Sequence, residues 1–300
     1  MADQKKKLHL LDAADERQSM LDDGEYEVYE KQGPPTGAMN YHYHDFYEII
    51  YILDGEFASL VQDKNYSLHK GDFLLIDRNV MHRYSYVEKR HESSRRIVMW
   101  VTDRMLSELG DYAGGLQAGL ERCFEKNGAR VCHFPVYYEE LLRGFLMKLA
   151  MDSIVDGEEA DYRRVMDRGY LTLFFSYLNQ LCVRKEYLLA GEEMADDPLV
   201  HRVSEYIDSH IEEDIFVDDI AEQVHMSKYY MIRKFKELTG LTIHSYLIRK
   251  RLIKASDEIK SGESVTNAWQ KAGFADYSSF LRNFKKAYGT SPREFADLNE

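Results

Sequence analysis

Cysteine is scarce in this sequence of 300 residues, which contains three of them. Their odd number and wide spacing exclude a disulfide framework and a zinc cluster. They indicate reduced thiols in a cytoplasmic protein, filling ordinary apolar positions. The three residues are Cys123, Cys132 and Cys182.

Long apolar runs are missing as well. No stretch reaches the ~18 consecutive apolar residues that a membrane-spanning helix needs. The first twenty residues, "MADQKKKLHLLDAADERQSM", include three lysines but no apolar region after them. They therefore do not have the pattern of a signal peptide. The sequence therefore predicts a cytoplasmic protein without a membrane partner.

Positive charge is in short supply overall, but it is unevenly distributed. The net charge is −13, and residues 1–200 hold 24 basic and 36 acidic residues, a balance of −12. Residues 201–300 hold 15 basic and 16 acidic residues, a balance of −1. Within this part, residues 216–286 hold 13 basic and 8 acidic residues, a balance of +5. An acidic front part and a locally basic rear segment indicate two parts with different tasks.

Short apolar runs rich in Tyr, Ile, Val and Phe follow one another from residue 41 to about 101. Short strands at this spacing, with no helical pattern between them, indicate a small antiparallel barrel or sandwich. The run ending at Asp54 leads into "DGE", which predicts a hairpin, and a second turn is expected at "DKN". We expect the first ~30 residues to be a frayed arm and residues 31–40 to be a loop.

Helical patterns replace the strand patterns after residue 102. Two long amphipathic segments precede the acidic, Pro-terminated stretch "AGEEMADDP", which predicts a linker. Their apolar faces are either core or a dimer surface. We therefore expect an α+β protein with an effector-binding barrel in residues 1–135, a helical dimerisation segment and linker in 136–198, and an all-α domain in 199–300.

Two units of similar layout occupy the last hundred residues, at 217–238 and 265–287. In the first, Ser227 is expected to cap a helix that buries Tyr230, Met231 and Phe235 and ends at Gly240. In the second, Val265, Ala268 and Trp269 form the first helix. Asp276 caps the next helix, Phe280 and Phe284 are its buried face, and Gly289 ends it.

Each unit is a helix, a tight turn and a second helix with basic residues on its open side, which is the helix-turn-helix layout. Such a helix fits the major groove of DNA, where Lys and Arg neutralise phosphates and side chains near its start reach base edges. One basic helix alone is usually a solvated face. Two tandem units with matching caps, buried aromatic residues and a net positive charge argue against that interpretation.

These units resemble the AraC/XylS family of transcription regulators over about 199–297, in "SKYYMIRKFKELTGLTIHSYL", "RKRLIKA" and "GFADYSSFLRNFKKAYGTSPREF". The resemblance implies double-stranded DNA and RNA polymerase as partners and a homodimer as the working form. It implies base contacts from Tyr229, Ile232, Arg233, Tyr277, Ser278, Leu281 and Arg282. It implies phosphate contacts, or solvated neighbours, at Lys228, Lys236, Lys285 and Lys286.

The sequence departs from the family pattern at three positions. Ala268 and Trp269 stand where the family usually has an Ile-Ala pair, so the first helix of the second unit is expected to pack differently. Lys228 replaces a Pro after the cap residue, and Ala296 replaces an Arg that follows "SPREF".

Two histidines near the start of the first apolar run are one residue apart, and a carboxylate follows. Within a strand, His42 and His44 would point to the same face, and Glu48 comes four residues after His44. Neutral imidazoles and a carboxylate suit Fe, Mn, Ni or Zn. The pattern alone is therefore compatible with a metal-dependent enzyme.

The front segment is similar to the cupin-type barrel that often precedes this DNA-binding module. Gly37, His42, His44, Glu48 and Gly55 match the first cupin motif, and Gly71, Asp72 and His82 match the second. The resemblance implies that His42, His44, Glu48 and His82 contact a small effector, often a sugar, with Tyr43 as a further contact. Tyr41 and Tyr51 are nearby candidates. The alternative is a divalent transition metal on the same three histidines and Glu48.

Two functions follow from these patterns. The first is a sequence-specific DNA-binding transcription regulator that responds to a sugar or related metabolite and is not an enzyme. The second is a metal-dependent cupin enzyme with an appended helical domain. Hydroxyl-rich ligands suit imidazole, carboxylate and tyrosine side chains, and two DNA-binding units have no evident use on an enzyme, so we expect the first.

Overall fold

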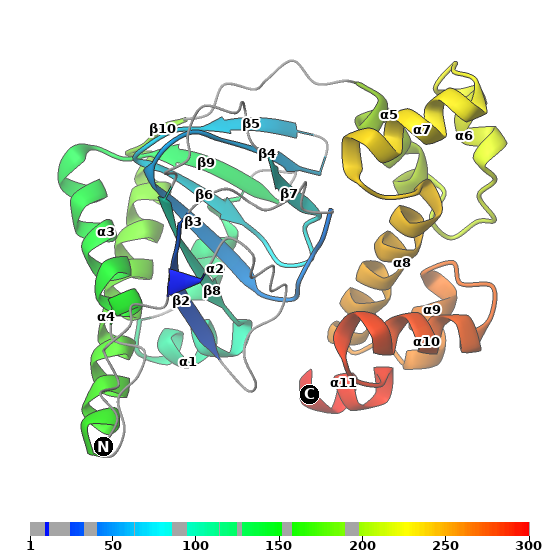
Figure 1. The fold of residues 1–300 in the computed structure, drawn as a ribbon. Coiled ribbons are helices and arrows are strands. Elements are labelled where there is room, and N and C mark those ends of the chain that lie inside the picture. The colour runs from blue at the N-terminus through cyan, green and yellow to red at the C-terminus, as the bar shows by residue number, and fades with distance from the viewer. Residues whose placement is uncertain are drawn as a thin grey trace, which may run out of the picture. The chain divides into compact units, whose positions relative to one another are not determined.

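The structure of the protein is a computed structural model, and Figure 1 shows its fold. It divides into two compact units, residues 1–196 and 197–300, and each is described by itself. The residues that the structure describes are 10–11, 25–32, 41–62, 64–85, 95–113, 115–124, 128–151, 158–189 and 198–299. The expected loop at 33–40, Gly37 and the expected linker at 190–197 lie outside them.

The first unit contains two sheets. The larger has seven strands in the order β1-β2-β8-β3-β6-β9-β10, and β1–β2 is its one parallel pair among the described strands. The smaller has the order β5-β4-β7 and is antiparallel. The bounds are β1 Leu10–Leu11, β2 Tyr26–Gln32, β3 Tyr47–Asp54, β4 Phe57–Val61, β5 Lys64–Leu68, β6 Asp72–Ile76, β7 His82–Ser85, β8 Arg95–Val101, β9 Ala129–His133 and β10 Leu188–Leu189.

Alternation along the strands creates two separate cores. In β3, Ile50 and Ile52 point into the interior between the two sheets, whereas Ile49 and Tyr51 point to the opposite face of the larger sheet. Successive side chains of a strand face opposite sides of a sheet. Both faces of the larger sheet carry apolar side chains here, because the smaller sheet covers one face and helices cover the other. The predicted antiparallel barrel is confirmed.

Helices cover the outer face of the larger sheet, with α3 and α4 side by side along it (Figure 1). Leu171, Phe174, Phe175 and Leu178 of α4 are fully buried against this face. Tyr26 in β2 donates a hydrogen bond of 2.6 Å to Asp167 in α4. The bounds are α1 Asp103–Ala113, α2 Leu116–Glu121, α3 Val136–Met151 and α4 Glu158–Arg184.

Three expectations for the first unit are wrong in part. Residues 26–30 are not part of a frayed arm and residues 31–32 are not loop, because together they form β2 and pair along their whole length with β8. Strands β9 and β10, which come after residue 102 where helical patterns were expected to replace strand patterns, extend the larger sheet. The hairpin at "DGE" does not form, because β3 pairs with β6 and β8 while β4 pairs with β5 and β7.

The chain instead turns a corner at Gly55 and passes from one sheet to the other. Gly55 has a φ of 87°, a left-handed conformation that glycine adopts without a Cβ clash. The hairpin predicted at "DKN" is confirmed, since β4 and β5 pair from Phe57–Leu68 to Val61–Lys64. This change of direction at Gly55 places β4 in the smaller sheet, which lies over the larger sheet and closes the interior.

All three cysteines are buried in the core between the larger sheet and its helices. Contact with Cys182 and burial raise the pKa of the Cys123 and Cys132 thiols, so these two remain protonated and unreactive. The expectation that the cysteines fill apolar positions is confirmed.

The second unit consists of helices. The long helix α8 runs between two helix pairs, α6–α7 and α9–α10, so the two predicted helix-turn-helix units sit at its two ends (Figure 1). Eighteen residues of α8 correspond to a length of about 27 Å. The bounds are α5 Pro198–Ser209, α6 Val217–Gln223, α7 Lys228–Thr239, α8 Ile243–Lys260, α9 Val265–Lys271, α10 Tyr277–Tyr288 and α11 Pro292–Asn299. Among the helices described in either unit, none has the length and apolarity to cross a membrane.

Candidate functional site

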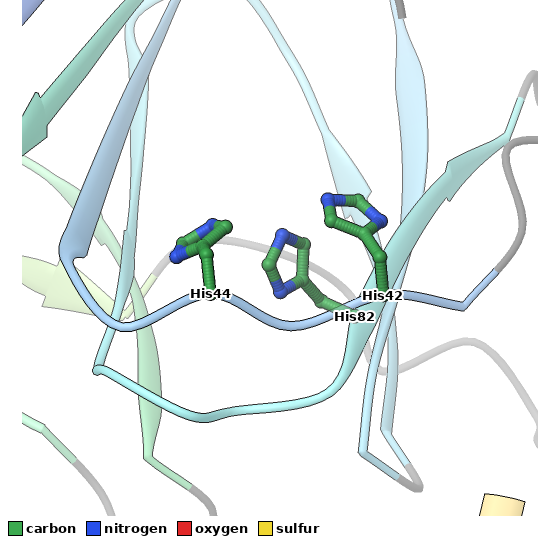
Figure 2. A group of neighbouring side chains, drawn as sticks. All are labelled: His42, His44 and His82. Carbon is green, nitrogen blue, oxygen red and sulfur yellow. The ribbon is translucent and has the colours of Figure 1, made fainter. Parts of the chain in front are cut away.

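Three histidines converge at the point where the two sheets of the first unit meet (Figure 2). His42 and His82 form a β-bridge, with backbone N–H···O distances of 3.0 and 2.9 Å. One ring nitrogen from each of His42, His44 and His82 lies within 4.8 Å of the others, and all three side chains are buried. The expected convergence of His42 and His44 is therefore present, although neither lies in a regular strand.

Glu48 completes this cluster from β3. Its carboxylate accepts hydrogen bonds from Tyr84 Oη at 2.7 Å and Trp100 Nε1 at 2.8 Å. His44 Nε2 lies 3.2 Å and His82 Nε2 lies 3.0 Å from Oε2 of the same carboxylate. Glu48 is 2% exposed, so these contacts are made away from solvent.

Backbone carbonyls fix the orientation of two of the rings. His44 Nδ1 lies 2.9 Å from the carbonyl of Phe46, and His82 Nδ1 lies 2.9 Å from the carbonyl of Val80. A carbonyl oxygen only accepts, so both Nδ1 atoms carry a proton. Each Nε2 faces Glu48, and it donates a hydrogen bond to the ionised carboxylate only when the ring carries its second proton.

The electrostatics of the cluster favour an ionised carboxylate. Burial raises the pKa of Glu48, but hydrogen bonds with His44 and His82 outweigh it and hold the pKa well below 4.5. Burial lowers the pKa of His44 below 6.5, against the opposing effect of Glu48. Burial and the Glu48 charge raise the pKa of Tyr84 well above 10, so it stays a donor.

The tyrosines suggested by the sequence differ in position. Tyr51 faces the helices and donates a hydrogen bond to Glu139 in α3, so it does not line the interior. Tyr41 is buried and Tyr43 half-buried beside His42 in the chain. Tyr84 and Trp100 were missed, although Tyr84 is two strand positions after His82 and therefore on its face of β7. No sequence signal placed Trp100 opposite Glu48.

The recognition helix of the first helix-turn-helix unit, α7, exposes most of the side chains expected to meet DNA. Tyr229 is 86% exposed, Arg233 and Lys236 are exposed, and Ile232 is half-buried. Lys228 is half-buried and donates to Asp218 in α6 at 2.7 Å.

The buried face of α7 corrects one expectation and confirms two. Met231 and Phe235 are fully buried, but Tyr230 is 45% exposed, with the Arg233 guanidinium 5.9 Å from its ring centroid. Tyr230 follows the exposed Tyr229 and points sideways instead of inward. Ser227 occupies the N-cap position without a side-chain hydrogen bond, while Gly240 ends the helix with a φ of 74°.

The second recognition helix, α10, has the expected features. Asp276 caps it through a bond from the Ser279 amide at 2.7 Å, Phe280 and Phe284 are fully buried, and Gly289 ends it with a φ of 73°. Leu281 is half-buried, and the other candidate contacts are exposed: Tyr277, Ser278, Arg282, Lys285 and Lys286.

The unusual Ala268–Trp269 pair finds room in this unit. Ala268 is fully buried in the core, and Trp269 packs half-buried against that core with its ring 6.1 Å from the ring of Tyr277. The indole therefore supports the first residue of α10 from the side. The large side chain at position 269, one position later than in the family pattern, thus packs beside the start of the recognition helix.

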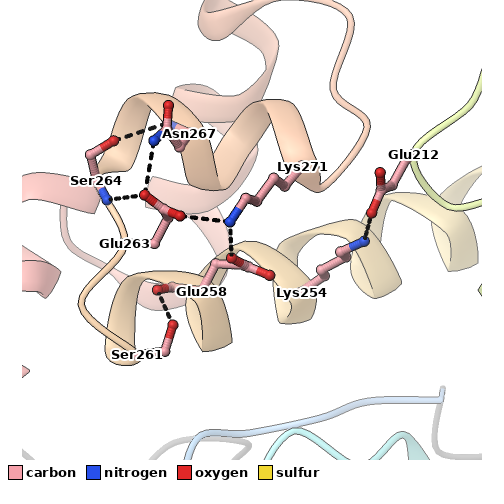
Figure 3. A network of polar contacts seen from close by, with 8 residues as sticks. All are labelled: Glu212, Lys254, Glu258, Ser261, Glu263, Ser264, Asn267 and Lys271. Atoms are coloured by element: carbon pink, nitrogen blue, oxygen red, sulfur yellow. Dashed lines mark hydrogen bonds and ion pairs between the residues drawn. The ribbon is translucent and has the colours of Figure 1, made fainter.

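A polar network ties α9 to α8 (Figure 3). Lys271 in α9 donates to Glu263 at 2.6 Å and to Glu258 in α8 at 3.1 Å. Hydrogen bonds from Lys271, from Asn267 and from the Ser264 amide lower the pKa of Glu263 to about 2. The network fixes the helix that precedes α10 without using any side chain expected to meet DNA.

Two family models match the chain. The model of an AraC-like ligand-binding domain matches residues 26–131, and that of a helix-turn-helix domain matches residues 220–297. Together the matched segments make up more than half of the chain. The first contains His42, His44, Glu48 and His82, and the second contains both recognition helices.

Several known proteins are similar to this chain over most of its length. The HTH-type transcriptional activator RhaS of Escherichia fergusonii is 28% identical over 261 residues, covering 87% of this chain and 88% of RhaS. RhaS of Klebsiella pneumoniae is 26% identical over 263 residues, with the same coverages of 87% and 88%. A crystal structure of apo ToxT from Vibrio cholerae is 17% identical, covers 92% of this chain and 98% of ToxT, and has a TM-score of 0.40.

Proposed function

Since the chain belongs to the AraC family of transcription regulators, we propose that a small hydroxyl-rich metabolite, a sugar or a close relative, controls its binding to DNA. One observation carries the proposal. A buried cluster of donors and acceptors lies in the matched ligand-binding domain, and two exposed, basic recognition helices lie in the matched DNA-binding domain of the same chain.

On the DNA side, α7 and α10 enter neighbouring major grooves. The length of α8 between the two units, about 27 Å, approaches the ~34 Å of one turn of B-DNA. Base edges are contacted by Tyr229, Ile232, Arg233, Tyr277, Ser278, Leu281 and Arg282. Phosphates are contacted by Lys236 and Lys285, and Lys228 reaches DNA by exchanging Asp218 for a phosphate.

On the effector side, the hydroxyl groups of the metabolite bind to the polar cluster of the barrel. His42, His44, Glu48 and His82 supply acceptors and donors, and Tyr43 adds a hydroxyl. Effector binding favours one arrangement of the regulator over another only if the affinities of the two arrangements differ. The protein acts as a sensor in the cytoplasm, and RNA polymerase is its partner at the promoter.

A second copy of the chain is a further partner. Four apolar side chains are exposed on the face of α4 that points away from the core: Tyr162, Val165, Met166 and Leu173. Their spacing of three, four and seven residues puts them on one stripe of the helix. An exposed apolar stripe of this kind supports a homodimer that forms along α4.

A divalent transition metal is the second candidate occupant of the barrel, favoured by the ring orientations. Histidine ligands commonly donate the ring N–H that is not on the metal to a carbonyl, as His44 and His82 do. His42, His44, His82 and Glu48 would hold the ion. It would act as a Lewis acid toward a hydroxyl or carboxylate of the effector.

Metal analysis separates this candidate from the first. Protein expressed with Fe, Mn, Ni and Zn supplied is expected to retain one metal in stoichiometric amount, and a double variant, His42→Ala with His82→Ala, is expected to lose it. If the wild type is free of metal after this expression, the ion is rejected. Chemical conversion of a bound sugar, in place of its recovery unchanged, would support the alternative function, a metal-dependent enzyme.

Selection of DNA tests the regulator directly. A pool of random duplexes is enriched on the full-length protein, and affinity for the enriched sequence is measured at several salt concentrations with and without candidate sugars. We expect one or two enriched sequence motifs, and an affinity that changes with at least one sugar. Enrichment of no sequence by the wild type, or the same enrichment by an Arg233→Ala, Arg282→Ala double variant, would contradict the proposal.

A further inference from the structure

Three thiols that are far apart in the sequence meet in the core between the larger sheet and its helices. Cys123 follows α2, Cys132 is in β9 and Cys182 is in the last turn of α4. Side-chain hydrogen bonds join Cys182 to Cys123 and to Cys132. Cys182 is therefore in contact with two further thiols, and none of the three belongs to the effector site or the DNA-binding surface proposed above.

The helices α2 and α4 approach each other closely beside Cys123 and Cys182. A methyl group in place of a Gly119 hydrogen would lie 3.2 Å from the Cβ of Asn179 in α4, which is closer than ordinary contact. The Cys123 thiol donates to Asn179 Oδ1 at 3.9 Å, and Asn179 Nδ2 donates to the carbonyl of Leu116 at 2.8 Å. Because Asn179 and Cys182 are one turn apart on α4, the same face of α4 meets Cys123 with both side chains. This close approach suits a disulfide, which needs Cα atoms about 4.4–6.8 Å apart.

Cys132 reaches Cys182 from the sheet and has less freedom to move. Alternation along β9 points Val131 into the interior between the sheets and Cys132 toward the helices. Cys132 is paired on both sides, with Phe73 in β6 and with Leu189 in β10. Cys123, in contrast, is in a turn after α2. The smaller backbone movement therefore brings Cys123 to Cys182.

The surroundings of Cys182 favour its thiolate, which is the form that reacts with oxidants. Hydrogen bonds from the Cys123 and Cys132 thiols outweigh burial and, with the charge of Arg130, lower the pKa of Cys182 below its ordinary value of 9. Arg130 is two residues before Cys132 and hence on the same face of β9. Cys182 is 9% exposed, whereas Cys123 and Cys132 are 0% exposed. A small oxidant therefore meets Cys182 first.

We propose that Cys182 is an oxidation site of this protein, at which a peroxide forms a reversible disulfide between Cys182 and Cys123. In the first step, the Cys182 thiolate attacks one oxygen of hydrogen peroxide. The O–O bond breaks, the sulfur is oxidised to a sulfenic acid, and the hydroxide that leaves takes up a proton to become water.

The second step closes the disulfide. As a protonated thiol, Cys123 does not attack the peroxide itself, but its sulfur lies beside the sulfenic acid of Cys182. The Cys123 sulfur attacks the Cys182 sulfur, the S–O bond breaks, and the departing hydroxide combines with the thiol proton of Cys123 as water. In total, two thiols and one hydrogen peroxide give one disulfide and two molecules of water.

The bond would join the turn after α2 to the last turn of α4, shortly before β10. In a reducing compartment such a disulfide is transient and reports the presence of an oxidant. The inference goes beyond the proposed function, because the oxidation requires neither an effector nor DNA. It stands or falls whether or not the barrel binds a sugar.

Mass spectrometry of the full-length protein tests the site. The protein is reduced, freed of reductant and treated with hydrogen peroxide, after which the free thiols are alkylated and the protein is digested. We expect two peptides joined through Cys123 and Cys182, with the loss of two hydrogens, and their separation by dithiothreitol. If excess peroxide consumes no thiol, or if the bond joins Cys132 to Cys182, the assignment is overturned.

Variants test the role of each thiol. Cys182→Ser should lose the disulfide and the reaction with peroxide. Cys123→Ser should lose the disulfide but leave a sulfenic acid on Cys182, which dimedone traps. The matched control is Cys132→Ser, which removes a buried thiol from the same core and should retain the disulfide. A disulfide that persists in Cys182→Ser or is lost in Cys132→Ser would overturn the pairing.

The dependence of the reaction on pH tests the thiolate. The rate of thiol loss with peroxide should reach half of its maximum below pH 9, and Arg130→Gln should shift this midpoint to higher pH. Circular dichroism before oxidation shows which variants are folded. Should Cys182→Ser or Arg130→Gln not fold, the joined peptides and the pH midpoint of the wild type decide, and a wild-type midpoint at or above 9 overturns the assignment of Cys182.

Discussion

His82 Nε2 lies 3.0 Å from the carboxylate of Glu48, although the two residues belong to different sheets. His82 is the first residue of β7 in the smaller sheet, and Glu48 is the second residue of β3 in the larger one. The contact is therefore part of the closure of the barrel as well as part of the proposed binding site. The side chains of the proposed binding site are thus also side chains that hold the two sheets together.

Replacement of Glu48 by Gln should therefore destabilise the first unit strongly. The amide keeps the shape of the side chain but loses its negative charge, which two donors and two histidine ring nitrogens surround. Breaking a buried ion pair by removing one charge costs about 3 kcal/mol. Urea denaturation at pH 7 measures the change in the free energy of unfolding. Glu186→Gln, at an exposed site, is the control. Equal stability of the two variants would mean that the cluster contributes nothing to the fold.

Within α7, neighbouring aromatic residues should differ sharply. Phe235→Ala removes a fully buried ring and should cost about 3–5 kcal/mol, together with DNA binding. Tyr230→Ala removes a ring that is 45% exposed and should cost less than about 1 kcal/mol. Denaturation of the full chain, followed by circular dichroism, compares them, and similar losses would contradict the observed orientation of Tyr230.

Base contacts and phosphate contacts should be distinguishable by salt. Arg233→Ala should weaken binding to the selected sequence by about 1–3 kcal/mol and relax its specificity at one position. Lys236→Ala should weaken binding to all sequences alike and reduce the slope of log affinity against log salt by about 1. Fluorescence anisotropy on specific and scrambled duplexes measures both. The assignment fails if the two variants have the same profile.

A charge on the exposed stripe of α4 should separate the proposed dimer. Leu173→Glu places a carboxylate in the apolar contact and is expected to give a monomer whose first unit is still folded. Light scattering after gel filtration gives the mass. Arg122→Glu, which adds negative charge on an exposed site of another segment, should remain dimeric. A monomeric wild type would remove the basis for this surface.

Acid should weaken the second unit through Glu263. Its folded-state pKa of about 2 is below the ordinary 4.5, so the ionised group stabilises the fold above pH 4.5, and this contribution is lost as the pH falls toward 2. A carbon NMR titration of the Glu263 carboxyl should give that low pKa, and Lys271→Met should raise it toward 4.5. A wild-type value near 4.5 would show that the network in Figure 3 is not formed in solution.

The patterns that predicted the fold correctly were those with strong local signals. Ser227, Asp276, Gly240 and Gly289 marked helix ends because caps and left-handed termini depend on neighbouring residues alone. The hairpin expected at Gly55 was wrong because a turn residue does not determine which strand becomes the partner. Whether β3 pairs with β4 or with β8 depends on packing between distant segments.

The candidate site was predictable where its members are close in the sequence. His42, His44 and Glu48 were recognised by spacing, and His82 by its motif. Trp100 was not found, because its place in the site comes from the register of β8 against β3, which no local pattern encodes. The same limit applies to Tyr230, whose neighbours in a short helix did not reveal which of two adjacent tyrosines turns outward.

The strand order of the larger sheet connects the barrel interior mechanically to the end of the first unit. From β3, which carries Glu48, the sheet continues through β6 and β9 to β10, the last described strand before α5. Neighbouring strands in this series are joined by backbone hydrogen bonds, over four residue pairs between β3 and β6, five between β6 and β9 and two between β9 and β10. A ligand that displaced β3 would therefore also displace β6, β9 and β10, because each of these strands is hydrogen-bonded to the one before it.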